Sequence, residues 1–352
     1  MMDETFRAVF AIPGDKDRRT GGFIYEARVL DALNAMGCAT RHLQLPAGFP
    51  DPTDAEMADC LRALRAVPAG TPIILDGLVF GAIDPAGLAQ VQAPVIAMIH
   101  HPLGLETGIG DARAAFLRQN EAAALRHTAH VIVPSPETAR VLTADFGADP
   151  TRLTCVPPGF GRPHVARAPV DPPLILSVGL LAPRKGHDVL IDALAQLADL
   201  PWQAQIAGKA HDPDYAAQLR AQVEDRDLQG RVAFAGEGGP DALTDMMNAA
   251  TIFALATRYE GYGMVLSEAM LYGLPVVTCD AGAVAQTVGD AAALVPPDDP
   301  DVFATALRHL LTDPAAATAL TTRARAKAAT LPTWQEAARA FARVIDNLTA
   351  EN

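Results

Sequence analysis

The chain lacks the features of a membrane-spanning or exported protein. No apolar run approaches the ~20 residues needed to span a bilayer, and Asp3 and Glu4 stand where a signal peptide would have basic residues. The cysteines are widely scattered and form no C-x-x-C pair, which suits neither a disulfide framework nor a zinc site (Cys38, Cys60, Cys155 and Cys279). We therefore expect a cytoplasmic protein with reduced thiols.

Positive charge is also scarce. The 28 lysines and arginines are outnumbered by 41 acids, and the net charge of −13 argues against a nucleic-acid partner. The dinucleotide fingerprint G-x-G-x-x-G and the Walker pattern G-x4-G-K-[ST] are both absent from the sequence. A nicotinamide oxidoreductase is disfavoured for that reason.

The pattern of apolar runs predicts an α/β protein. The 352 residues, half of them hydrophobic, suffice for two domains of ordinary size. Short apolar runs alternate with Ala-rich amphipathic stretches, which predicts repeated βα units and parallel sheets. Strands are expected at 7–12, 39–45, 72–76, 95–99, 130–134 and 152–156, and, after a linker at 157–173, at 174–178, 203–207, 232–235, 251–256 and 275–278. Helices are expected at 22–36, 53–66, 112–127, 136–146, 187–198, 214–226, 240–248, 264–271, 300–311, 315–329 and 333–348.

One segment places two carboxylates and two glycines at a strand-to-helix junction. It reads Glu260-Gly261-Tyr262-Gly263-Met264-Val265-Leu266-Ser267-Glu268. A helix beginning near Met264 offers free N–H groups and the positive end of its dipole to an anion such as a diphosphate. Helical side chains tilt toward the N-terminus, so Glu268 would lean back to the junction and accept hydrogen bonds from sugar hydroxyls. An ordinary strand-turn-helix is the alternative.

A basic turn follows the strand expected at 174–178. Gly179 ends that strand, and Arg184 and Lys185 open the next helix. A guanidinium and an ammonium beside a helix N-terminus make a clamp for a diphosphate, although a plain basic turn is the alternative. Only four of the 28 basic residues are lysines, which makes Lys185 at this position less expected by chance.

Two features of the first half follow strand ends. Gly21 and Gly22 come after the first strand, where most glycine pairs are simply turns. His100 and His101 come directly after the strand at 95–99, and a histidine there can hydrogen-bond a sugar hydroxyl. No acid or further histidine accompanies them at ligand spacing, so no metal site is predicted.

The segment at 260–268 resembles the E-G-[FY]-G-x4-E signature of retaining glycosyltransferases of family 4. Flanking residues from Arg231 to Val277 agree with that family, and Ser177–Leu190 looks like its phosphate-binding segment, with Leu180 where many members have arginine. The resemblance implies a GT-B fold of two doubly wound Rossmann-like domains facing a cleft. An acceptor-side domain would span 1–165 and a donor-binding domain 166–333, and the last helix, in 334–352, would cross back to the first domain.

The resemblance also implies an activity. A hexose-type sugar would move, with retention of configuration, from a UDP or GDP sugar to a sugar, lipid or lipid-linked glycan. No cofactor or essential metal is implied. The catalytic residues would be His100, Glu260, Arg184 and Lys185. The donor would be held by Gly21, Gly22, Gly179, Arg184, Lys185, Glu260, Gly261, Tyr262, Gly263, Met264, Val265 and Glu268.

Several alternatives stay open. A sugar-nucleotide epimerase or hydrolase of similar architecture is the main one, although the paired glutamates argue against it. A non-catalytic two-lobed binding protein would lack the phosphate clamp. Arginines and apolar residues alternate in 112–130, which is compatible with peripheral contact at the inner face of the cytoplasmic membrane. The sequence does not define the sugar, the base, the acceptor or the oligomeric state.

Overall fold

The computed structural model describes residues 6–350, so Asp3 and Glu4 lie outside the described residues. The chain forms two compact units, Met1–Phe160 with Pro332–Asn352, and Gly161–Leu331. The first division falls five residues before the expected boundary because the following segment is bound to the second unit. Arg162 donates to the carbonyl of Ala328 at 2.7 Å, and Arg167 donates to that of Met247 at 2.6 Å. The expected linker is therefore held along one unit.

The first unit contains a six-stranded parallel sheet in the order β2-β1-β3-β4-β5-β6. Its strands are β1 (Ala8–Pro13), β2 (Thr40–Leu45), β3 (Ile73–Asp76), β4 (Val95–Met98), β5 (His130–Val133) and β6 (Leu153–Cys155). Its helices are α1 (Gly21–Ala35), α2 (Asp54–Arg65), α3 (Gly77–Ala82), α4 (Pro85–Leu88), α5 (Asp111–Leu125), α6 (Pro136–Asp145) and α14 (Trp334–Ala350).

Helix α14 belongs to the first unit although it ends the chain. Its apolar side, with Phe341 and Ile345, is completely buried. The Tyr25 ring of α1 lies 6.2 Å from the Phe341 ring and 5.9 Å from the Trp334 ring, measured between centroids. Burying aromatic surface of this size contributes on the order of 2–3 kcal/mol per side chain. The predicted return of the last helix to the first domain is confirmed.

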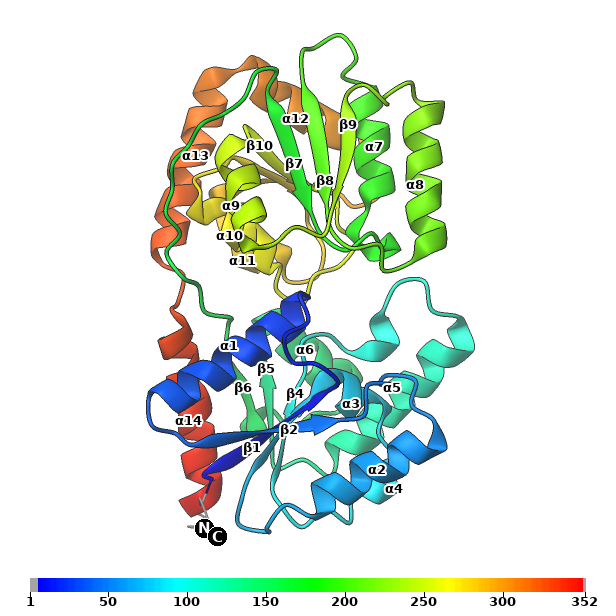
Figure 1. The fold of residues 1–352 in the computed structure, drawn as a ribbon, viewed down its shortest axis with the longest axis vertical. Helices are drawn as coiled ribbons and strands as arrows, with labels where there is room; N and C mark the ends of the chain where they lie inside the picture. The colour runs from blue at the N-terminus through cyan, green and yellow to red at the C-terminus, as the bar shows by residue number, and fades with distance from the viewer. Residues whose placement is uncertain (1–5, 351–352) are drawn as a thin grey trace. The chain divides into compact units, whose positions relative to one another are not determined.

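The second unit contains a parallel sheet in the order β12-β11-β10-β7-β8-β9. Its strands are β7 (Leu174–Val178), β8 (Gln203–Ala207), β9 (Val232–Gly236), β10 (Ile252–Leu255), β11 (Val276–Cys279) and β12 (Ala292–Val295). Its helices are α7 (His187–Ala195), α8 (Pro213–Asp225), α9 (Pro240–Ala249), α10 (Met264–Leu271), α11 (Val284–Val288), α12 (Pro300–Thr312) and α13 (Pro314–Ala329). Figure 1 shows α7 and α8 on one side of this sheet and α9 and α10 on the other.

The strand order of the second unit defines where it can bind a ligand. Counted from its own first strand, the order is 3-2-1-4-5-6, the doubly wound Rossmann order. The chain direction of the winding reverses between β7 and β10, and ligands bind outside the carboxyl ends of the strands at such a point. The predicted class, two doubly wound α/β units, is confirmed.

Four short elements were missed by the sequence analysis. Helices α3, α4 and α11 have six, four and five residues, too few for a helical repeat to be visible. Strand β12 reads AALV, and alanine has low strand propensity. Packing of β12 along β11 decides its conformation.

Candidate functional site

The basic turn is clamped against the end of β10 in the second unit. Pro183–Lys185 form a single 3-10 turn, and Gly186 follows with a φ of 63°. A Cβ atom on Gly186 would lie 1.8 Å from the carbonyl oxygen of Ala256, so only glycine fits. The amide of Arg258 also donates to the carbonyl of Arg184 at 2.8 Å. Arg184 and Lys185 are thereby fixed beside the carboxyl ends of β7 and β10.

Lys185 and Glu260 form the centre of the site. The Lys185 Nζ donates to Glu260 Oε1 at 2.5 Å, and the Thr257 hydroxyl donates to the same oxygen at 3.0 Å. Arg184 Nη1 lies 3.7 Å from this oxygen and donates to the carbonyl of Tyr259 at 3.0 Å. Glu260 Oε2 has no partner among the described residues. One oxygen therefore holds the cations, and the other can accept a hydrogen bond from a ligand.

Glu260 is ionised in this setting. The residue is only 6% exposed, and burial by itself would raise its pKa. The charges of Lys185 and Arg184, with the hydrogen bonds from Lys185 and Thr257, outweigh burial and hold the pKa below its ordinary value. An anion entering the site would therefore meet two cations that are already held by a carboxylate.

Directly after Gly186, His187 adds no charge to the turn. The side chain is fully buried, and burial, followed by the nearby Lys185 charge, lowers its pKa to about 4. The imidazole is neutral at physiological pH. Arg184 and Lys185 are therefore the positive charges that this turn presents.

Helix α10 begins at the same edge of the sheet, as predicted. Gly263 caps it with a φ of 87°, a conformation that glycine adopts without strain. Glu260 precedes it through Gly261 and Tyr262, and the helix opens with Met264 and Val265. The first N–H groups of a helix have no partner within the helix and can bind an anion.

Glu268 lies one turn into α10 and is half-buried. Its carboxylate has no hydrogen-bond or ion-pair partner among residues 6–350, in contrast to that of Glu260. Burial raises its pKa to about 6. An unpaired, partly desolvated carboxylate is costly for folding, and such groups often mark ligand sites.

The residues that brace the basic turn were not predicted from the sequence. Arg258 makes two hydrogen bonds to Asp188, at 3.0 and 2.7 Å, and one to Asp298 at 2.7 Å. It also donates to the carbonyl of Pro183 at 2.5 Å, and the Tyr215 hydroxyl donates to Asp188 at 2.7 Å. These contacts join loops that are far apart in the sequence, so no local motif predicts them.

His100, Gly22 and Gly21 lie together in the first unit. Gly21 and Gly22 form the first turn of α1 and not a separate turn before it, and neither has a positive φ. The helix expected from Gly22 is confirmed, and it begins one residue earlier, at Gly21. A Cβ on Gly22 would lie 3.2 Å from His100 Cδ2, so close packing against His100 favours glycine there.

Two acidic residues lie beside His100 in the structure. The sequence showed no acid at ligand spacing from His100, and no metal site was predicted for that reason. His100 Nε2 lies 3.1 Å from Glu26 Oε1, and Asp76 joins them so that one ligand atom from each residue lies within 4.8 Å of the others. Glu26 comes from α1 and Asp76 from the end of β3. Glu26 lies 74 residues and Asp76 lies 24 residues before His100, so no motif search along the sequence would find the cluster. This set could hold a cation.

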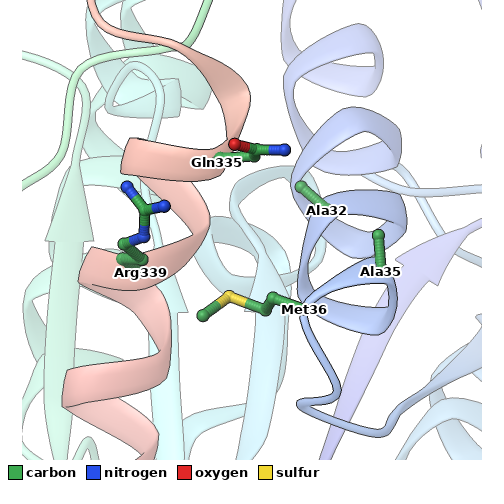
Figure 2. Close-up of a pocket in the computed structure, with 5 residues that line it drawn as sticks. All are labelled: Ala32, Ala35, Met36, Gln335 and Arg339. Atoms are coloured by element: carbon green, nitrogen blue, oxygen red, sulfur yellow. The ribbon is translucent and has the colours of Figure 1, made fainter.

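A hollow between α1 and α14 is not part of this chemistry. Figure 2 shows it lined by Ala32 and Ala35 of α1, by Met36 just after this helix, and by Gln335 and Arg339 of α14. Small apolar groups and two polar side chains form its wall, without a carboxylate or a histidine. None of the predicted site residues lines it.

Fold and comparisons define the class. Two Rossmann-like units make this a GT-B protein, and solved structures agree. Sucrose-phosphate synthase from Thermosynechococcus elongatus aligns with a TM-score of 0.81 at 22% identity, over 98% of this chain and 100% of that one. Anabaena HepE in complex with UDP and glucose aligns with a TM-score of 0.75 at 18% identity, over 97% of this chain and 100% of that one.

Sequence comparisons define the family. The model for glycosyl transferases group 1 matches residues 163–327, and that for glycosyltransferase family 4 matches residues 77–160. The chain belongs to glycosyltransferase family 4, group 1. It is 33% identical to D-inositol 3-phosphate glycosyltransferase of Kineococcus radiotolerans over 52% of this chain and 49% of the relative. It is 29% identical to mannosylfructose-phosphate synthase of Agrobacterium fabrum over 48% of this chain and 42% of the relative. The matches thus span about half or less of these relatives.

Among residues 6–350, no helix is both long and apolar enough to cross a membrane.

Proposed function

We propose that this chain is a retaining glycosyltransferase that moves a hexose-type sugar from a UDP or GDP sugar to a sugar, lipid or lipid-linked glycan. The observation that carries the proposal is the Lys185–Glu260 pair at the strand-order reversal of the second unit. Cations held in place before the reaction need no reorganisation when charge develops on a departing diphosphate.

Each group of the second unit has a role in this proposal. Arg184, Lys185 and the N–H groups at the start of α10 bind the diphosphate. Oε2 of Glu260 accepts a hydrogen bond from a hydroxyl of the transferred sugar, and the unpaired Glu268 accepts those of the ribose. In the first unit, His100 hydrogen-bonds a sugar hydroxyl.

The transfer step itself needs charge stabilisation and positioning. The bond between the anomeric carbon and the diphosphate oxygen breaks, and a bond to the acceptor oxygen forms on the same face. The acceptor hydroxyl proton passes to the leaving phosphate oxygen. We propose that no metal or cofactor is essential, because Arg184 and Lys185 can balance the diphosphate charge.

A thermal-shift panel of UDP, GDP, ADP and the corresponding hexose donors tests donor binding. A nucleotide at 100 times its Kd stabilises the native state by about 2.7 kcal/mol, which corresponds to about 5–10 °C for a domain of this size. Lys185→Met should lose most of the shift, while Lys209→Met, an exposed lysine of the same unit, should keep it. If no nucleoside diphosphate raises the melting temperature, the proposal fails.

Nucleotide release with and without acceptors tests the reaction. A transferase releases the nucleoside diphosphate rapidly only when an acceptor is present. Equal release from the donor alone would identify a hydrolase or a hydrolysing epimerase in place of a transferase. The anomeric proton coupling of the product, measured by NMR, reports retention or inversion.

A further inference from the structure

Two buried carboxyl groups of the first unit lie beside a partly exposed imidazole without a compensating cation. Glu26 is fully buried, Asp76 is 2% exposed, and His100 Nε2 lies 3.1 Å from Glu26 Oε1. Among the described residues no lysine or arginine pairs with either carboxyl group. Two ionised carboxylates side by side at this depth would be strongly disfavoured.

A single shared proton resolves the arrangement. Asp76 Oδ1 accepts the backbone N–H groups of Leu78 and Val79, at 2.9 and 3.2 Å, which stabilises one negative charge. Burial raises the pKa of Glu26 to about 8 and that of Asp76 well above its ordinary value. One oxygen of each carboxyl group lies within 4.8 Å of the other, and Glu26 Oε2 is buried with no hydrogen-bond partner among the described residues. Two acids this close and this deeply buried titrate as a unit, and one proton shared between them leaves a single negative charge.

The imidazole of His100 is fixed by the same surroundings. The centroid of the Tyr25 ring lies 5.4 Å from the centroid of the imidazole. Gly22 also packs closely against the imidazole, since a Cβ atom on Gly22 would lie 3.2 Å from His100 Cδ2. Burial lowers the pKa of His100, so the ring is neutral and carries one hydrogen. Nδ1 has no partner among the described residues, and the side chain is 23% exposed.

Other titratable groups around the ring are already engaged. The Tyr25 hydroxyl donates to the carbonyl of Val156 at 2.5 Å. The next residue, His101, lies 3.8 Å from the carboxylate of Glu106. Glu26 and Asp76 are therefore the groups that control the state of His100.

We propose that Glu26 and Asp76 share one proton and act as positioning residues that hold His100 in the tautomer with hydrogen on Nε2. Nε2–H then donates to Glu26, and the lone pair of Nδ1 is presented for a hydrogen bond from a sugar hydroxyl. The use of Nδ1 on a sugar rests on the proposed function. The tautomer itself rests only on the buried cluster. Fixing an imidazole by a buried carboxyl group is a known way of choosing its tautomer.

The tautomer can be read directly by NMR. In the full chain labelled with 15N-histidine, two-bond proton–nitrogen spectra distinguish the two neutral forms, and His100→Gln assigns the signal. We expect a single Nε2–H form from pH 6 to 8. Glu26→Gln should keep the Nε2–H form. Its amide N–H donates to Asp76 in place of the shared proton, and its amide oxygen still accepts from Nε2–H. Glu26→Leu should give a mixture of tautomers.

Activity provides a second readout. Glu26→Leu should lower kcat about 10- to 100-fold, by analogy with the loss found when a partner that orients a metal-bound imidazole is removed. Its nucleotide thermal shift should be unchanged, since the diphosphate contacts lie in the second unit. Glu26→Gln should keep most of kcat.

Two kinds of result would overturn the inference. One is an unchanged tautomer in Glu26→Leu, or an Nδ1–H form in the wild type. The other is a stoichiometric divalent ion in the purified chain that Glu26→Gln removes, since a metal requires both carboxylates ionised and a bare Nε2. The spectra need no substrate. A protein with the expected tautomer but no transfer would refute the proposed function and not the positioning pair.

Discussion

Removing the charge of Glu268 should stabilise the second unit while weakening nucleotide binding. Burial raises the pKa of this carboxyl group from an ordinary 4.5 to about 6. The folded state therefore binds the proton more tightly than the unfolded state, and stability falls as the pH rises from 4.5 to 6. At 1.36 kcal/mol per pKa unit, the loss above pH 6 is at most about 2 kcal/mol. Glu268→Gln should recover that amount at pH 8 and nothing below pH 4.5.

Denaturant unfolding can isolate this unit. Trp202 is buried in the second unit and Trp334 belongs to the first, so a Trp334→Phe background leaves fluorescence from the second unit alone. Glu224→Gln is the matched control because it removes the same charge from an exposed position on α8. Equal stabilities of the two glutamine variants at pH 8 would refute the argument from burial.

The same variant reports the cost of function. A charge-assisted hydrogen bond from the ribose to Glu268 is worth about 1.5–3 kcal/mol, so Glu268→Gln should weaken nucleotide binding about 10- to 100-fold. Gain of stability together with loss of binding would mark Glu268 as a carboxylate kept for its ligand. Unchanged nucleotide affinity would remove Glu268 from the donor site.

Three further outcomes are expected. Lys185→Ala should raise the transfer barrier by about 2–4 kcal/mol, because it removes a contact made in the transition state. Lys209→Ala should leave the barrier unchanged, and steady-state rates of the two folded variants test the difference. Activity should survive dialysis against EDTA, and complete loss restored by manganese or magnesium would show that a metal is required. Gly22→Ala should displace the His100 ring, because the added Cβ would lie 3.2 Å from it, and should lower kcat with little loss of stability. Gly70→Ala is the control, because the space around Gly70 is open. Equal kcat values in the two variants would contradict the proposed contact between Gly22 and His100.

Local pattern determined the repeated βα units of this protein. The strands β7 and β8 and the helix α10 were predicted to the residue, because apolar runs bounded by glycine and proline carry their own periodicity. The glycine before α10 and the basic turn after β7 were also visible, since each depends on neighbours in the chain. The roles of Glu260, Glu268 and Lys185 in a reaction stay predictions.

Tertiary structure alone decided which distant residues meet. The sequence could not show that Arg258 braces the turn of Arg184, or that Glu26 and Asp76 enclose His100, because parallel strands bring their carboxyl ends to one edge whatever their separation along the chain. The glycine pair in α1 shows the same limit. A helix from Gly22 was expected, but the absence of a side chain there is explained only by the structure, in which the His100 ring, two residues beyond the end of β4, packs against Gly22.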